Sequence, residues 1–216
     1  LLGNEFDSTM NYRFTDLCRQ FFAEKRIGVY EFDAHFHRLL MRYPRPLANL
    51  QMNLLDSHDV PRFLSLCSGD RRRFKLAVLF QMMAPGIPSV FYGDEHGLMG
   101  LAEADYRRPM PWQAKDEELS AFYRTLISLR RRFPVLASGG YRTFLLNQRQ
   151  EVYGFMREQG ETQIYILLNN SEKPQTVEFP VFGRSSLTDL LTDRVYTPGS
   201  SGVSLILPPV SGVVLS

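Results

Sequence analysis

The spacing of apolar residues changes once along this chain, and the change divides it into two parts. Over residues 1–137, short apolar runs alternate with longer segments in which apolar residues recur about every three to four positions, the period of a buried helix face. From Ser138 onward only short runs remain, rich in β-branched and aromatic residues and separated by Gly, Asn and Pro. The pattern predicts an α/β part followed by an all-β part, with the boundary near Val135–Gly139.

The first part follows the order strand then helix three times, which is typical of a piece of a parallel α/β sheet. Strands are predicted at residues 6–12, Leu50–Leu55 and Ser89–Tyr92. Helices are predicted after a cap at Thr15 or Asp16, and at Phe32–Tyr43, Arg71–Met83 and Glu117–Phe133. Asp70 is a suitable N-cap for the helix from Arg71, which Pro85 and Gly86 end.

The number of predicted strands limits the fold of each part. A complete (β/α)₈ barrel takes about 250 residues and eight strands, so the units predicted here are too few for one. In the second part the predicted strands are Tyr141–Leu146, Glu151–Arg157, Thr162–Leu168, Pro174–Phe179, Ser186–Leu191 and Val203–Leu207.

The most informative stretch is Asn53–Arg62, where an apolar run stops on a His-Asp pair and a Pro-Arg turn. A buried strand that delivers polar side chains from its carboxyl end into a crevice is typical of α/β enzymes. The string Ser57-His58-Asp59 does not indicate a catalytic triad, because neighbours on an extended chain point to opposite faces. The same geometry argues against a metal site at Asp94-Glu95-His96.

Three motifs, in order, resemble the α-amylase family of glycoside hydrolases, and most closely its neopullulanase, cyclomaltodextrinase and maltogenic amylase branch. They are Phe6–Tyr12, Asn53–Arg62 and Pro85–Gly97. Asp56 stands where the family usually has glycine, and Val60 where it usually has threonine. By this resemblance, residues 1–137 are the sixth to eighth β/α units of a (β/α)₈ TIM barrel and residues 138–216 are an antiparallel β-sandwich. The chain is then expected to be the C-terminal part of a longer enzyme.

The resemblance also implies an activity and divides its catalytic groups. Retaining glycosidases use two carboxyl groups about 5 to 5.5 Å apart, and spacing alone would nominate Asp59 and Glu95. In the family, however, the nucleophile and the acid/base follow the fourth and fifth strands, upstream of Leu1, so this chain alone is expected to be inactive. His58 and Asp59 match the family's transition-state pair, which holds the sugar hydroxyls at the cleavage point. The expected reaction is hydrolysis of α-1,4 glucosidic bonds in starch-type glucans, pullulan or cyclodextrins, with α-1,6 bonds left open.

Further candidates for substrate binding lie near the strand ends: Arg62, Tyr92, Asp94, Glu95 and Arg107. An arginine can hold a carboxylate by two parallel hydrogen bonds and an aromatic ring can stack on a sugar, but salt bridges and core packing explain these residues equally well. The alternative to an enzyme is a non-catalytic α-glucan-binding or assembly module of the same fold. An Arg-x-Asp motif followed by a glutamate, both upstream of Leu1, would distinguish the enzyme.

Composition and charge narrow the partners. At 44% hydrophobic and 22% charged residues the chain is globular, and its net charge of +2 gives no reason to expect nucleic acid or a membrane. The expected partner is an α-glucan oligosaccharide or polysaccharide, and a homodimer is left open. Cys18 and Cys67 are too few and too far apart for a disulfide scaffold, which favours a reducing compartment and hence the cytoplasm. The segment indicates no cofactor and no metal, and it does not address the calcium dependence of a longer enzyme.

Overall fold

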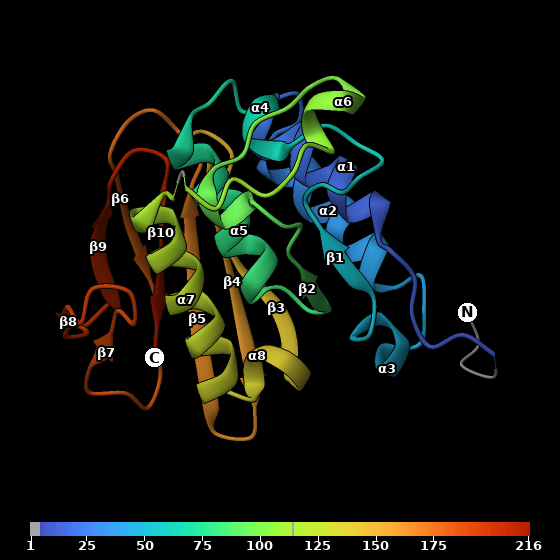
Figure 1. The fold of residues 1–216 in the computed structure, drawn as a ribbon. Coiled ribbons are helices and arrows are strands. Elements are labelled where there is room, and N and C mark those ends of the chain that lie inside the picture. The colour runs from blue at the N-terminus through green and yellow to red at the C-terminus, as the bar shows by residue number, and fades with distance from the viewer. Residues whose placement is uncertain (1–4, 114) are drawn as a thin grey trace.

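The computed structural model describes residues 5–113 and 115–216, with the helices gathered in the first part and the antiparallel strands in the second (Figure 1). The helices are α1 (Tyr12–Cys18), the π-helical turn η1 (Arg19–Ala23), α2 (Val29–Leu40), α3 (Arg45–Ala48), α4 (Phe63–Leu66), α5 (Arg71–Met83), the 3₁₀ turn η2 (Asp94–His96), α6 (Glu103–Tyr106), α7 (Glu117–Arg132) and α8 (Val135–Ser138). None of the helices in the described ranges is long and apolar enough to span a membrane.

The parallel sheet of the first part is shorter than predicted. Strands β1 (Met52–Leu54) and β2 (Ile87–Ser89) pair in parallel, with Met52 opposite Ile87. The predicted strand at residues 6–12 is reduced to one parallel bridge between Met10 and Met52. It stops there because the Asn11 side chain accepts a hydrogen bond from the Phe14 amide and begins α1.

Helix α5 shows how closely local signals can define an element. Its bounds, Arg71–Met83, are those predicted, and the Asp70 side chain accepts from the amides of Arg72 and Arg73. The prediction for α1 was wrong in its cap, because Thr15 lies inside the helix and bonds the Leu54 carbonyl instead. Helix α2 also begins earlier than the predicted Phe32, at Val29 after Gly28.

The second part contains only antiparallel pairs. Its strands are β3 (Gly140–Asn147), β4 (Val152–Gln159), β5 (Thr162–Asn169), β6 (Gln175–Phe179), β7 (Leu187–Thr188), β8 (Val195–Tyr196), β9 (Val203–Leu207) and β10 (Ser211–Leu215). They form a sheet in the order β10-β5-β4-β3 and the pairs β6-β9 and β7-β8. Apolar side chains of β6 and β9, such as Val177 and Leu205, share a core with Met156 of β4, so two layers face each other as in a sandwich.

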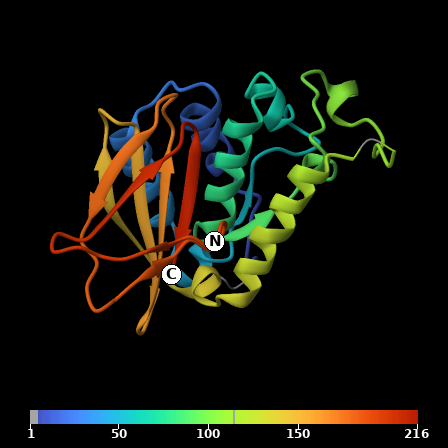
Figure 2. The same cartoon turned by 90° about the vertical axis from the view of Figure 1, so that its left-hand side faces the viewer.

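The largest apolar core joins the two parts. Helix α5 lies between the four-stranded sheet and α7 (Figure 2). Phe80 of α5 is fully buried and meets Phe155 of β4 edge to face, with ring centroids 5.7 Å apart. Phe32 of α2 meets Tyr153 of β4 in the same way at 5.2 Å. Helices of the first part therefore pack directly against the four-stranded sheet of the second part. The division into domains at residue 137 remains a prediction.

Candidate active site

Strand β1 delivers the predicted His-Asp pair to the surface. Leu54 and Leu55 are buried, and beyond them the chain turns through a bridge between Ser57 and Val60. The Asp59 amide donates to the Ser57 hydroxyl at 3.0 Å, which fixes the turn. The turn lies at the carboxyl end of β1, beside α4 and α6 at the top of Figure 1. In α/β barrel enzymes the catalytic side chains lie at this end of the strands.

Three polar side chains surround the Asp59 carboxylate, whose side chain is 51% exposed. The Tyr12 hydroxyl lies 3.0 Å from Oδ2, while His58 Nε2 and Arg107 Nη2 lie 3.3 and 3.6 Å from Oδ1. Tyr12 was not among the predicted site residues, although it ends the first family motif, next to the strand that carries Asp59. The arrangement orients an accessible anion without covering it.

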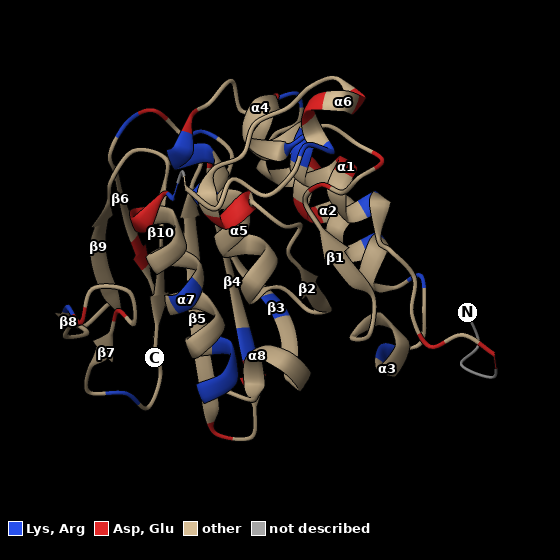
Figure 3. Ribbon diagram, in the orientation of Figure 1, with Lys and Arg blue, Asp and Glu red and all other residues tan. Residues whose placement is uncertain are grey.

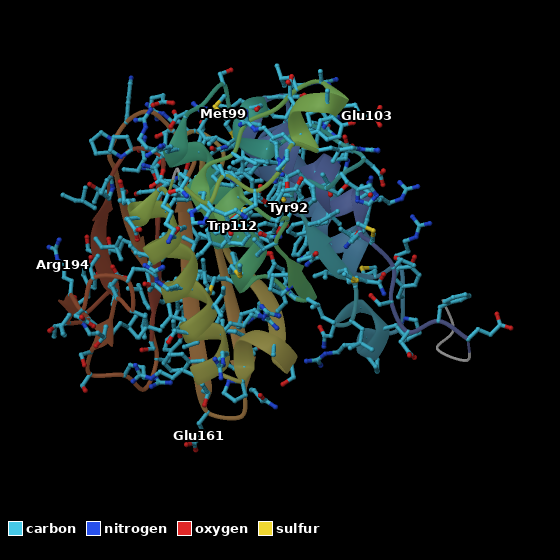
Figure 4. The ribbon with its side chains drawn as sticks, viewed as in Figure 1. Tyr92, Met99, Glu103, Trp112, Glu161 and Arg194 are labelled. Atoms are coloured by element: carbon cyan, nitrogen blue, oxygen red, sulfur yellow. The ribbon has the colours of Figure 1, made fainter. Side chains whose placement is uncertain are left out.

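Arg107 ties this turn to helix α6. Its Nε donates to the His58 carbonyl at 2.7 Å, and its Nη1 lies 2.9 Å from the Glu103 carboxylate. Charged residues of both signs gather around α6 (Figure 3), and Glu103 projects from the upper edge of the molecule in Figure 4. Arg107 is about half exposed, so salt weakens its ion pairs. Its stabilising effect on the turn therefore depends on its several partners together rather than on one ion pair.

Arg62 and Asp94 lie below the surface. Their side chains are 0% and 5% exposed, and Arg62 Nη1 lies 3.1 Å from Asp94 Oδ1. The same nitrogen donates to the Tyr92 carbonyl at 2.6 Å. Asp56, also buried, accepts from the Phe63 amide at 2.7 Å. Arg62 and Asp94, which were predicted to bind substrate, thus face protein rather than the open surface.

Burial sets the protonation of the two carboxyl groups. It raises the pKa of Asp94 well above the usual value, and the charge of the neighbouring Asp56 raises it further. Burial also raises the pKa of Asp56, but hydrogen bonds from Asp94 and from the Phe63 amide, and the charge of Arg62, act against it. Burial thus disfavours the ionised form of both carboxyl groups.

The remaining candidates, Tyr92 and Glu95, are partly exposed. Tyr92 is 38% exposed, and its hydroxyl donates to the Arg108 carbonyl at 2.7 Å. Glu95 accepts from the Gly93 amide at 2.8 Å, and its other oxygen lies 3.7 Å from His96. Glu95 and Asp59 therefore have separate partners. In the described residues there is no group of His, Cys, Asp and Glu suited to hold a metal ion.

Comparison with known families accounts for both parts of the chain. Residues 1–125 match the family described as alpha amylase, catalytic domain, and these residues are more than half of the chain. The chain belongs to the α-amylase family. Residues 142–214 match maltogenic amylase, C-terminal domain. The predicted family and fold class are confirmed: units of an α-amylase catalytic domain are followed by an antiparallel C-terminal domain.

Individual relatives belong to the predicted branch. The chain is 39% identical over 219 residues to neopullulanase 2 of Thermoactinomyces vulgaris, covering 100% of this chain and 37% of that protein. It is 31% identical over 217 residues to a cyclomaltodextrinase of Geobacillus thermopakistaniensis, covering 99% and 37%. A solved cyclomaltodextrinase superposes with a TM-score of 0.93 at 32% identity, covering 99% of this chain and 38% of the other. The chain thus spans little more than a third of the length of these relatives.

Proposed function

We propose that this chain supplies the transition-state-stabilising part of the active site of a retaining glycosidase that acts on α-glucans. The observation that carries the proposal is the Asp59 carboxylate, exposed at the carboxyl end of β1 and oriented by Tyr12, His58 and Arg107. The relatives' names, neopullulanase and cyclomaltodextrinase, support α-glucans as the substrate class.

The chemistry follows from where charge develops during cleavage. The sugar ring flattens and becomes positively charged as the glycosidic bond breaks, and an anion that accepts hydrogen bonds from its hydroxyls binds this state more tightly than the resting ring. Asp59 is the anion in this proposal, and His58 is a donor to the same hydroxyls. Tyr12 and Arg107 hold Asp59 in place, while Tyr92 and Glu95 contact the substrate at its edge. The nucleophile and the acid/base come from other β/α units of the enzyme.

The first test replaces Asp59 by Asn in the complete enzyme. Asn keeps the size but removes the charge, so kcat falls by about two to four orders of magnitude, equivalent to ~3 to 5 kcal/mol, while KM changes little. Asp105→Asn, an exposed carboxylate on α6, is the matched control and leaves kcat unchanged. Steady-state kinetics on maltooligosaccharides provide the measurement. A normal kcat with a raised KM would show that Asp59 binds only the ground-state sugar.

The second test concerns the 216-residue chain by itself. Since it lacks the proposed nucleophile and acid/base, it releases no sugar from starch, pullulan or cyclodextrin. Turnover that copurifies with the chain and disappears in Asp59→Asn would assign the reacting pair to this chain. A complete protein that binds α-glucan but never cleaves it would favour the non-catalytic binding module.

The two cysteines bear on the compartment. Cys18 and Cys67 are both buried and unbonded, and burial raises the pKa of Cys67 to about 12, so neither is a reactive thiolate. A protein that keeps free thiols fits a reducing compartment, and we place this one in the cytoplasm.

A further inference from the structure

Both ends of the turn that carries His58 and Asp59 are anchored in one buried polar cluster, formed by Asp56, Arg62 and Asp94. Asp56 precedes the turn and bonds the Phe63 amide across it at 2.7 Å. Arg62 follows the turn, and its own amide donates to the Gly100 carbonyl at 2.9 Å. The turn with the exposed His58 and Asp59 is therefore held at both ends by buried polar residues.

The Arg62 guanidinium also contacts the loop that follows β2. It lies over the Phe91 ring, 3.9 Å from the centroid, and 4.8 Å from the centroid of Tyr92. With its bonds to the Tyr92 carbonyl and to Asp94, the guanidinium connects the turn after β1 to the loop after β2. A shift of either loop would have to move a fully buried arginine.

This cluster costs stability. Within the described residues, Arg62 Nε and Nη2 and Asp56 Oδ1 are buried without a hydrogen-bond partner. Unpaired buried polar atoms and buried charges destabilise a fold, and apolar residues of similar volume often serve stability better. A costly polar cluster that flanks the turn with an exposed carboxylate is better explained by placement of that carboxylate than by stability.

We propose that Arg62 is a positioning residue for Asp59. By fixing the turn to the loop after β2, Arg62 holds the Asp59 carboxylate in the position in which it stabilises the transition state. The proposal rests on the function proposed above for Asp59. Asp94 acts through Arg62 by accepting its Nη1 hydrogen. Lysine cannot replace Arg62 fully, because a single ammonium group cannot reproduce the planar contacts with Phe91 and the bonds to Tyr92 and Asp94 together.

The test compares Arg62→Met, Arg62→Lys and Asp59→Asn with a matched control, Arg157→Met, in the complete enzyme. Arg157 is equally buried but bonds carbonyls outside the turn, among them those of Gly140 and Leu136. Loss of Arg62 should lower kcat by about 10- to 100-fold with little change in KM, since small displacements of a reacting group have effects of this size. Arg62→Lys should retain part of the activity. Arg157→Met should lower the unfolding temperature but leave kcat unchanged when assayed well below that temperature.

The outcomes separate this inference from the proposed function. If Asp59→Asn lowers kcat and Arg62→Met leaves kcat at the level of Arg157→Met, the positioning role is overturned and the proposed function stands. If Asp59→Asn leaves kcat intact, the proposed function itself fails. Should Arg62→Met not fold, Asp94→Leu decides, because it removes the acceptor of the Arg62 Nη1 hydrogen. A lower kcat when this variant is assayed well below its unfolding temperature supports the inference, and an unchanged kcat refutes it.

Discussion

The buried carboxyl pair Asp56 and Asp94 shows what a single residue's surroundings can do to its protonation. The pKa of Asp94 lies well above its ordinary value in the folded state because burial and the negative charge of Asp56 disfavour its ionised form. In the unfolded chain the same group ionises near pH 4. The folded state therefore binds more protons than the unfolded state between about pH 4 and the raised pKa.

This difference predicts how stability depends on pH. The stabilising contribution of Asp94 is fully present below about pH 4 and is lost as pH rises through its raised pKa. Each tenfold increase in the proton affinity of Asp94 on folding corresponds to ~1.4 kcal/mol of stability lost over this range. Urea unfolding at several pH values from about 4 to 8 should show this decline, and Asp94→Asn should flatten it. Asp105→Asn serves as the control, because Asp105 is exposed. An equal slope in Asp94→Asn and in the unsubstituted chain would contradict the assignment.

Arg157 is a second buried charge, but its partners are neutral. It is fully buried in β4 and donates to backbone carbonyls of Met83, Leu136, Gly139 and Gly140. Burial lowers its pKa to about 9, and the charge of nearby Arg130 acts in the same direction. The guanidinium thus satisfies the carbonyl ends of helices α5 and α8, where cations are favourable.

Removing this side chain leaves those carbonyls buried and unpaired. Arg157→Met should destabilise the chain by about 1 to 3 kcal/mol for each carbonyl that stays buried without a partner. Arg142→Met is a suitable control, because Arg142 is largely exposed and lies 3.6 Å from Glu158, a surface pair worth about 0 to 1 kcal/mol. Chemical denaturation of both variants gives the comparison. Equal losses would show that the buried carbonyls find other partners.

At the scale of elements, the sequence was most informative where side chains cap their own helix. Asp70 and the pair Pro85-Gly86 define α5, because the signals that begin and end it are local. Strand β10 was not predicted because it pairs with β5, from Ser211 opposite Asn169 to Leu215 opposite Tyr165, and short strands take their stability from such distant pairing. The strand at residues 6–12 failed for the opposite reason, since the Asn11 cap prevailed over the apolar run.

The connection from α5 to β2 depends on a glycine. Gly86 has φ of +113°, and a Cβ there would lie 2.4 Å from the Asn53 side chain and 3.0 Å from the Gln51 carbonyl. Gly86→Ala should therefore cost about 2 to 4 kcal/mol, combining backbone strain with overpacking. Gly160→Ala has a positive φ of +58° but nothing within 4 Å, so it should cost only about 1 kcal/mol. Similar unfolding midpoints for the two variants would refute the steric part of this explanation.

At the scale of the whole molecule, the sequence predicted the residues of the site better than their contacts. His58 and Asp59 stand at the strand end where the motif placed them, but Tyr12 reaches Asp59 across 47 residues. Contacts at such separations depend on the register of the whole sheet, which local patterns do not specify. Arg62 and Asp94 illustrate the same limit, because no local pattern distinguishes a buried arginine beneath a site from one that faces a sugar.

The parallel sheet also has consequences for assembly. Met10, Met52 and Ile87 lie side by side in register and are 40%, 36% and 44% exposed. In the part of the chain that the structure describes, no further strand extends β2, so an open edge accompanies this apolar row. Exposed strand edges and apolar patches favour self-association.

We therefore expect the 216-residue chain to form dimers or larger species at micromolar concentration. Replacing Met52 and Ile87 together by Lys should shift it toward monomer, because charges on an edge oppose pairing while costing little at exposed positions. Phe182→Lys is the matched control, since Phe182 is 82% exposed but lies outside this sheet. Sedimentation velocity over a range of concentrations distinguishes the variants. If the unsubstituted chain is a monomer throughout, or if Phe182→Lys disperses it as well as the double variant does, the apolar row on β1 and β2 is not the associating surface.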